Sequence, residues 1–211
     1  MKLLFASNSN WEEFLPYGNR QFYKKGSIIH RQGEVGEGFY YLEKGLVKIT
    51  TTTASGSDSL LRIALPSQLL GVQAMDQLVH YTTAVANKNS VLYFFPYEMA
   101  KELMFQKPAM NELFLQSVID EMYTLALKIN DYRLPAEQKV AMLLLNIYEE
   151  FHQHDIPLTQ KDVANSTGLT RITVYKIFKE WKEKGYIATI GKSISIINPS
   201  ILQHYAQRIY K

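Results

Sequence analysis

Residues 160–179, QKDVANSTGLTRITVYKIFK, decide the fold of the last third of the chain. The stretch fits two ordinary helices with a glycine between them, or a helix-turn-helix. A helix-turn-helix needs a small residue where its helices cross, a residue that tolerates positive φ at the turn, and apolar residues where the second helix packs inward. Ala164, Gly168, Val174 and Ile177 meet these needs at the fifth, ninth, fifteenth and eighteenth positions of the stretch. The spacing predicts a helix-turn-helix.

The flanks of this motif add a cap, a stop and a hairpin. Thr170 is a good N-cap for the second helix, because its side-chain oxygen can accept a bond from an unpaired amide of the first turn. Gly185 ends that helix as a C-cap glycine would. Residues 186–190 and 193–197 are rich in β-branched side chains and flank a glycine-lysine pair, which predicts a β-hairpin. Together these features predict a winged helix-turn-helix.

Positive charge is concentrated in the same region. The chain has 211 residues, with 23 Lys and Arg against 20 Asp and Glu. Residues 1–134 carry 13 of each sign, so the whole excess lies in residues 135–211. Between residues 170 and 192, six basic side chains accompany two acidic ones. Such an excess suits a phosphate backbone, although a solvated lysine-rich helix face has the same composition.

The second helix and its surroundings offer candidate contacts to double-stranded DNA. Its expected exposed face carries guanidinium and ammonium donors for guanine edges, together with methyl groups able to touch thymine. The candidate base-reading residues are Arg171, Ile172, Thr173, Tyr175 and Lys176. The candidate phosphate contacts are Thr159, Gln160, Thr170, Lys179, Lys182 and Lys192.

The first half of the chain has the pattern of an antiparallel β domain. Its short segments are rich in β-branched and aromatic residues and are punctuated by glycines, which favours a barrel or sandwich. Pro96 then opens a helical stretch, since proline is tolerated in the first turn of a helix. The predicted strands are residues 27–30, 39–42, 46–53, 59–64, 82–86 and 90–95.

A long helix is predicted from residue 108 to residue 134. Leu134-Pro135 ends it, because the residue before a proline is pushed out of helical geometry. Apolar residues alternate at spacings of 3 and 4 along it, the pattern of heptad a and d positions. Such a stripe packs on the helix's own domain or pairs the helix with a second copy. We expect a parallel dimer seam formed by Leu115, Val118, Met122, Leu125, Ile129 and Tyr132.

The predicted fold class is therefore α+β, in three parts. Residues 1–107 form an antiparallel, jelly-roll-like β-roll, residues 108–134 a long dimerisation helix, and residues 135–211 the winged helix-turn-helix. Residues 25–49, KGSIIHRQGEVGEGFYYLEKGLVKI, resemble the glycine-marked β-roll of cyclic-nucleotide-binding domains. The layout resembles the Crp/Fnr family of bacterial transcription regulators. That resemblance implies a homodimer on a near-palindromic operator, with an effector between β-roll and long helix.

The sequence departs from the family where a cyclic nucleotide would bind. The family's cassette is Phe-Gly-Glu followed by Arg-Ser/Thr-Ala, whose Glu binds the ribose and whose Arg pairs with the phosphate. Here the matching stretches are Leu70-Gly71-Val72 and Thr82-Thr83-Ala84, so both charged ligands are missing. Burying a phosphate without a counter-charge is costly, so cyclic AMP or GMP is not expected as the effector.

Other effectors stay open at this stage. The chain has no cysteine, which excludes a cysteine-ligated iron–sulfur cluster or haem, and His80 alone is a weak candidate ligand. No cofactor is predicted. The pocket either takes an apolar, aromatic or peptide-like effector, or is filled by side chains with no effector at all. Its candidate lining is Tyr41, Leu70, Gly71, Thr82, Thr83, Met122 and Thr124.

The recognition helix also departs from its family pattern, Arg-Glu-x-x-x-Arg. Arg171 matches, but the glutamate is replaced by Ile172 and the second arginine by Lys176. Because Ile172 cannot accept a hydrogen bond from cytosine, the family's G·C-anchored half-site is not expected, and an A·T-richer site is our hypothesis.

Two rival classes of function are weaker. A P-loop, a nucleophile elbow and a metal-ligand helix are all missing from the sequence, so an enzyme is not expected. An effector-sensing module that regulates a partner protein without binding DNA is the alternative, but the basic helix and the wing argue against it. No membrane span or signal peptide is indicated, so we expect a cytoplasmic protein, with RNA polymerase as a partner if it is an activator.

Overall fold

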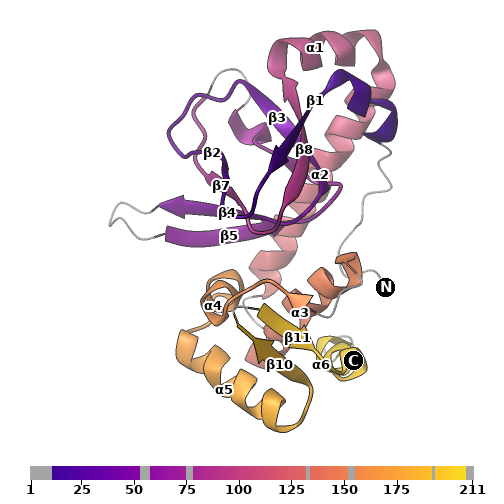
Figure 1. The fold of residues 1–211 in the computed structure, drawn as a ribbon. Coiled ribbons are helices and arrows are strands. Elements are labelled where there is room, and N and C mark those ends of the chain that lie inside the picture. The colour runs from indigo at the N-terminus through magenta and orange to yellow at the C-terminus, as the bar shows by residue number, and fades with distance from the viewer. Residues whose placement is uncertain are drawn as a thin grey trace. The chain divides into compact units, whose positions relative to one another are not determined.

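The computed structural model describes residues 11–52, 58–74, 78–131, 134–151, 155–191 and 193–207. These residues form two compact units, which divide between Thr124 and Leu125. Figure 1 shows the helices and strands of both units. The division falls inside the long helix rather than at its predicted end. The α+β architecture expected from the sequence, a β-roll followed by a long helix and a winged helix-turn-helix, is confirmed.

The first unit is built on two four-stranded antiparallel sheets. One has the order β1-β8-β3-β6 and the other the order β2-β7-β4-β5. Six strands match the predicted segments, whereas β1 and β6 were not predicted. The bounds are β1 (Asn19–Tyr23), β2 (Ile28–His30), β3 (Gly38–Lys44), β4 (Val47–Thr52), β5 (Asp58–Ala64), β6 (Leu69–Leu70), β7 (Thr83–Ala86) and β8 (Ser90–Pro96).

Short helical turns and two helices complete this unit. The 3-10 turns are η1 (Trp11–Glu13), η2 (Leu15–Tyr17) and η3 (Val72–Ala74), and the helices are α1 (Tyr97–Gln106) and α2 (Pro108–Asp131). Gly45 makes the turn from β3 to β4 with φ +114°, and a Cβ there would collide with Ser90. Only glycine therefore fits this corner of the roll.

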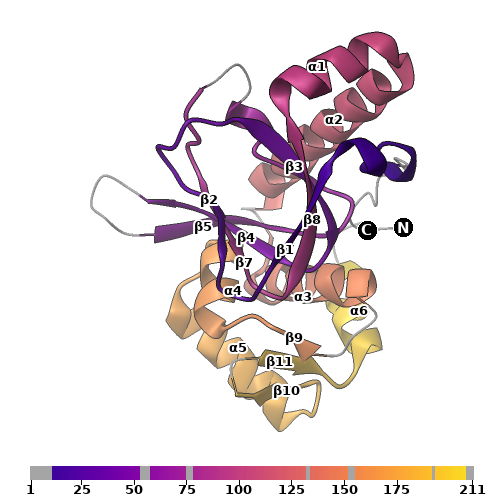
Figure 2. The same ribbon diagram turned by 45° about the horizontal axis from the view of Figure 1, so that its top comes forward.

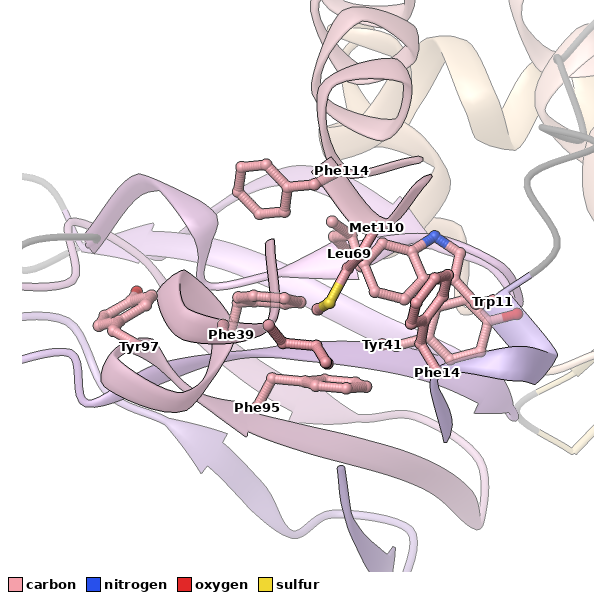
Figure 3. Close-up of a cluster of buried hydrophobic side chains, with 11 residues drawn as sticks. Trp11, Phe14, Phe39, Tyr41, Leu69, Phe95, Tyr97, Met110 and Phe114 are labelled. Carbon is pink, nitrogen blue, oxygen red and sulfur yellow. The ribbon is translucent and has the colours of Figure 1, made fainter. Parts of the chain in front are cut away.

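Two cores hold the roll together. Alternate residues of β3 point to opposite faces of its sheet, so Phe39 and Tyr41 pack toward the helices while Leu42 packs between the two sheets. The core between the sheets takes aliphatic residues from both of them. The core under the helices is aromatic, and Figure 3 shows Met110 of α2 set among its rings; its buried members are Trp11, Phe14, Phe39, Tyr41, Leu69, Phe95, Tyr97, Ala100, Leu103, Met110 and Phe114.

The aromatic core joins the start of the chain to the long helix. Trp11 stacks on Tyr41 with ring centroids 5.6 Å apart, and Phe39 stacks on Phe95 at 5.2 Å. Phe114 of α2 meets Phe39 with a centroid distance of 5.2 Å. Rings in such offset and tilted contacts add about 0.5–1.5 kcal/mol per pair beyond the area they bury.

The predicted seam of α2 is largely exposed in this chain. Leu115, Met122 and Leu125 are 52%, 65% and 43% exposed. Val118 is half-buried against the aromatic core, and Ile119, which the heptad count left out, is 56% exposed. The exposed stripe is thus rotated slightly from the predicted one. The side chain of Ile129 and the whole of Tyr132 lie outside the described residues.

The second unit is a small helical domain with a three-stranded sheet. Its helices are α3 (Ala136–Phe151), α4 (Gln160–Thr167), α5 (Arg171–Glu183) and α6 (Pro199–Gln207). The antiparallel sheet has the order β10-β11-β9, so the predicted hairpin gains a third strand. Neither that strand nor α6 was predicted. The strands are β9 (Asp155–Ile156), β10 (Ile187–Ile190) and β11 (Ser193–Ile196).

Candidate nucleic-acid interface

The first helix of the motif is closed at both ends. At its start, Thr159 Oγ1 accepts a bond from the Asp162 amide at 3.2 Å, and the Asp162 carboxylate accepts one from the Thr159 amide at 2.9 Å. This reciprocal pair is a capping box. At its end, Gly168 adopts φ +70°, the left-handed conformation that a tight interhelical turn needs. Thr159, a predicted phosphate contact, therefore also serves as a cap.

The second helix is positioned by its cap and by a buried apolar face. Thr170 Oγ1 accepts a bond from the Thr173 amide at 3.1 Å and lies 2.8 Å from the Thr173 hydroxyl. One face is buried against the domain through Val174, Ile177, Phe178 and Trp181. The spacing of the motif predicts only the first two of these as inward residues.

The opposite face of α5 brings the candidate base-reading residues together. Arg171, Ile172, Tyr175 and Lys176 are exposed, Ile172 to 68% and Tyr175 to 54%, and Thr173 is half-buried. Positions three and four residues apart share one face of a helix, so Tyr175 lies beside both Arg171 and Ile172. The Thr173 hydroxyl is hydrogen-bonded to the Thr170 hydroxyl. The methyl group of Thr173 is therefore the part of its side chain that is free to contact a ligand.

The candidate phosphate contacts lie on α5 and at the start of α4. Lys179 and Lys182 are exposed on α5, while Thr159 and Gln160 are half-buried at the start of α4. Figure 2 shows β10 and β11 beside α5, in the arrangement expected of a wing. Lys192 lies outside the described residues, so its predicted contact has no structural counterpart here.

The acidic side chains of α5 lie only in its C-terminal half, whereas basic side chains occur along its whole length. Its acidic side chains lie near the C-terminal end, where Glu183 lies 4.0 Å from Lys179 and Glu180 lies 2.6 Å from Lys184. Within the described residues, Arg171 and Lys176 form no ion pair. The N-terminal half of the exposed face is thus positively charged, which suits binding to a polyanion.

The residues predicted for an effector pocket are only partly brought together. Thr82 is buried, and its Oγ1 accepts a bond from Gln73 Nε2 at 2.9 Å and lies 3.4 Å from His30 Nε2. The imidazole rings of His30 and His80 stack on each other. A Cβ at Gly71 would meet His80 Cε1 at 3.2 Å, so Gly71 and Thr82 border the same stacked pair.

The other pocket candidates lie elsewhere in the first unit. Tyr41 stacks on Trp11 in the aromatic core, on the opposite face of its sheet from Leu70, which packs between the sheets. The Thr83 hydroxyl accepts a bond from a backbone amide of the neighbouring loop, and Thr124 donates to its own helix. Met122 is 65% exposed. These residues do not converge on a common site within this chain.

The sequence indicates His80 as a weak candidate ligand but does not predict that it stacks on His30 inside the roll. His30 and His80 are both buried, and neither Nδ1 atom has a hydrogen-bond partner within the described residues. Burial lowers the pKa of His30 to about 3, with further lowering by His80 and by Arg62. Burial also lowers the pKa of His80, against the opposing effect of Glu34. Both rings are therefore neutral near pH 7.

The two units match two known domain families. A profile of the cyclic nucleotide-binding domain matches residues 20–107, and a profile of the Crp-like helix-turn-helix domain matches residues 138–205. The transcriptional activator protein Anr of Pseudomonas protegens is 26% identical over 188 residues, covering 83% of this chain and 75% of that protein. The fumarate and nitrate reduction regulatory protein of Escherichia coli is 24% identical over 196 residues, covering 87% and 76%.

Solved structures share the whole layout. A CRP/FNR-family transcriptional regulator from Thermus thermophilus aligns with a TM-score of 0.76 at 21% identity, covering 90% of this chain and 98% of that one. FixK2 from Bradyrhizobium japonicum aligns with a TM-score of 0.74 at 17% identity, covering 89% and 96%. At these identities the likeness concerns the fold.

The fold and the interface define a DNA-binding transcription regulator, with a β-roll unit joined by a long helix to a winged helix-turn-helix. The chain belongs to the Crp/Fnr family of transcription regulators. The relative from Pseudomonas protegens is a transcriptional activator, and the relative from Escherichia coli is a regulatory protein. A module that controls a partner protein without binding DNA is not favoured. None of the helices in the described residues is long and apolar enough to cross a bilayer.

Proposed function

We propose that the protein acts as a homodimer on a near-palindromic operator, with α5 of each copy in successive major grooves. The observation that carries this proposal is the exposed face of α5, where the positive charges of Arg171 and Lys176 lie beside Ile172 and Tyr175. Two-fold symmetry then sets the half-sites about 34–36 Å apart, one turn of DNA.

The exposed stripe of α2 supports pairing with a second copy. Single exposed apolar side chains are common, but Leu115, Ile119 and Met122 follow one another along a single helix at spacings of 4 and 3, each more than half exposed. A parallel pair of such helices would bury this stripe, as in a two-stranded coiled coil. The exposed Tyr123 lies at its edge.

The base-reading face supports an operator that is richer in A·T than the usual family site. Ile172 is 68% exposed and has no hydrogen-bond acceptor, so it can contact a thymine methyl but cannot accept from the cytosine amino group. The Thr173 methyl adds a second apolar contact, because its hydroxyl is engaged by Thr170. Arg171 supplies a donor pair for one guanine.

Selection of binding sites from random duplex DNA tests this proposal directly. Two-fold symmetric sites with A·T pairs at the positions next to the Arg171 guanine are expected. Recovery of the family's G·C-anchored half-site would contradict the proposed readout, and recovery of no sequence at low salt would contradict DNA binding itself. Lys182→Ala should weaken binding to all duplexes alike and lower the salt slope, whereas Arg171→Ala should relax specificity at one base pair.

We also propose that cyclic AMP and cyclic GMP are not the effectors. Val72 and Thr82 stand where the family's ribose-binding Glu and phosphate-binding Arg would be, and the Thr82 hydroxyl is already bonded to Gln73. A phosphate would then be buried without a cationic partner. Titration calorimetry with both nucleotides checks this, and specific binding by either one would overturn it. No resident cofactor is assigned.

DNA as the target implies action in the cytoplasm, and contact with RNA polymerase if the operator lies upstream of a promoter. One of the named relatives, Anr of Pseudomonas protegens, is a transcriptional activator. Transcription in vitro from a promoter that carries the selected site, with and without the protein, separates an activator from a repressor.

A further inference from the structure

The face of α2 that packs on the roll changes its chemistry along the helix. Met110 and Phe114 are buried in the aromatic core. Ser117 and Glu121 follow on the same face, because residues three and four apart share one side of a helix. Ser117 is buried, and the Glu121 side chain is 34% exposed. The contact with the roll therefore starts apolar and ends polar.

Two directional bonds hold the polar part of this face. Trp11 Nε1 lies 3.3 Å from Ser117 Oγ and donates to it, and Arg62 Nη2 lies 3.0 Å from Glu121 Oε1. A hydrogen bond weakens steeply with angle, so these two bonds add a directional constraint to the packing of the apolar side chains. The two bonds therefore fix the rotation of α2 about its own axis.

Arg62 is also bonded within the roll. Its Nη1 donates to Gln68 Oε1 at 3.1 Å, and its Nη2 donates to the Leu69 carbonyl at 3.0 Å. The Arg62 side chain is only 14% exposed. A guanidinium is planar and carries its donors in a fixed fork, so a shift of its acceptors on one side moves the whole group.

Arg62 thus bonds to the start of a segment, residues 68–74, that borders the stacked rings of His30 and His80. The Gly71 carbonyl accepts a buried bond from the Tyr97 hydroxyl at 2.8 Å, at the start of α1. On its other side Gly71 lies against His80, and Gln73 bonds to Thr82. This segment thus touches the interior of the roll, α1 and, through Arg62, α2.

We propose that Arg62 is the positioning residue through which residues 68–74 of the roll set the rotation of α2. Its bond to Glu121 turns the stripe of Leu115, Ile119 and Met122 away from the roll and toward a second copy. Any ligand or substitution that moves residues 68–74 then changes how well two copies meet. The functional half of this inference rests on the proposed homodimer, while the effect on α2 itself does not.

The experiment compares Glu121→Gln and Arg62→Met, alone and combined, with the wild type. The control is Glu98→Gln, which breaks the exposed pair between Glu98 and Lys101 on α1 of the same unit. Hydrogen exchange of α2 amides, the dimer dissociation constant and the affinity for the selected operator are measured for each. Melting temperature is measured in parallel, to separate positioning from stability.

Glu121→Gln and Arg62→Met are each expected to speed amide exchange in α2 and to weaken dimerisation about tenfold, the factor of one hydrogen bond to a charged group. Their combination should cost no more than Arg62→Met alone, because both remove the ion pair between Arg62 and Glu121. The Glu98→Gln control should change neither quantity.

If the variants have lower melting temperatures but keep wild-type dimer and operator affinities, the bond between Arg62 and Glu121 only stabilises the fold, and the proposal is overturned. Additive effects of the two substitutions would do the same. If the wild type proves monomeric, the proposed function fails. Amide exchange in α2 still decides the matter in that case: unchanged exchange in both variants overturns the positioning role, and faster exchange supports it.

Discussion

His30 and His80, which are 50 positions apart in the sequence, stack in the roll with their ring centroids 4.0 Å apart and their planes 12° from parallel. β2 carries the first ring, and the loop before β7 carries the second. Arg62 and Glu34 are the charged residues that act on them, and the phenol ring of Tyr40 stacks on His30 at 6.3 Å. The pair lies beside Thr82, whose Oγ1 is 3.4 Å from His30 Nε2.

This stack makes the stability of the roll sensitive to acid. Burial lowers the pKa of His30 from 6.5 to about 3, so the unfolded chain binds a proton more readily than the folded one. The contribution of the neutral His30 to the free energy of unfolding is therefore fully present above about pH 6.5 and is lost as the pH falls toward 3. At pH 5 the loss from this one group is about 2 kcal/mol. Urea unfolding at pH 7.5 and pH 5.5 measures the loss.

A variant without the titrating ring should lose this dependence. His30→Phe keeps an aromatic ring in the stack but binds no proton, so its stability should change less between the two pH values. His204→Gln, on the exposed part of α6, serves as the control and should follow the wild type. Equal pH dependence in the wild type and His30→Phe would contradict the assignment.

The cap of α4 gives a second prediction, which separates two roles of Thr159. Thr159→Val removes the hydroxyl that accepts from the Asp162 amide and should destabilise the second unit by about 1 kcal/mol. If Thr159 also contacts a phosphate, operator affinity of the folded variant falls while the salt slope stays the same, because a neutral hydroxyl displaces no counterion. Circular dichroism and gel shifts at several salt concentrations measure the two effects, and unchanged unfolding would refute the cap.

The helix-turn-helix could be predicted because its rules are local. Ala164 and Gly168 are needed for steric reasons within one short segment, and the structure places both as expected. The strand β1 was missed because it lies at the edge of its sheet with little burial, so its sequence lacks a clear alternation. The strands β6 and β9 have two residues each, too few for any periodic pattern.

The parts that could not be predicted depend on long-range contacts. The apolar pattern of α2 does not predict which side of the helix faces the roll. That side is determined by the packing of the aromatic core, against which Val118 lies while Ile119 is exposed. Tyr41 and its neighbour Tyr40 look alike in the sequence, but strand alternation sends them to different cores. The bond between Arg62 and Glu121 joins residues with no local relationship.

The exposed stripe of α2 gives a third prediction. Ile119→Glu places a charge at the centre of the proposed seam and should dissociate the dimer, since two like charges would face each other across it. Its melting temperature should change little, because Ile119 is 56% exposed. Phe105→Glu is a matched control on α1, where the side chain is 88% exposed. Sedimentation velocity at micromolar concentration measures both, and a dimeric Ile119→Glu would rule out this seam.

The recognition helix gives a fourth prediction, on specificity. Ile172→Glu restores a carboxylate that can accept a hydrogen bond from the cytosine amino group. The variant should gain preference for a C·G pair beside the Arg171 guanine and lose preference for A·T there, a change of about 1–3 kcal/mol in discrimination. Because the Ile172 side chain is exposed, folding should be unaffected. Site selection with the variant and the wild type in parallel measures the shift.

Tyr175→Phe is the control, since it keeps the size and position of the ring on the same face of α5. Identical selected sites for Ile172→Glu and the wild type would mean that position 172 does not meet a base pair, and the docking of α5 in the groove would have to be turned about its axis.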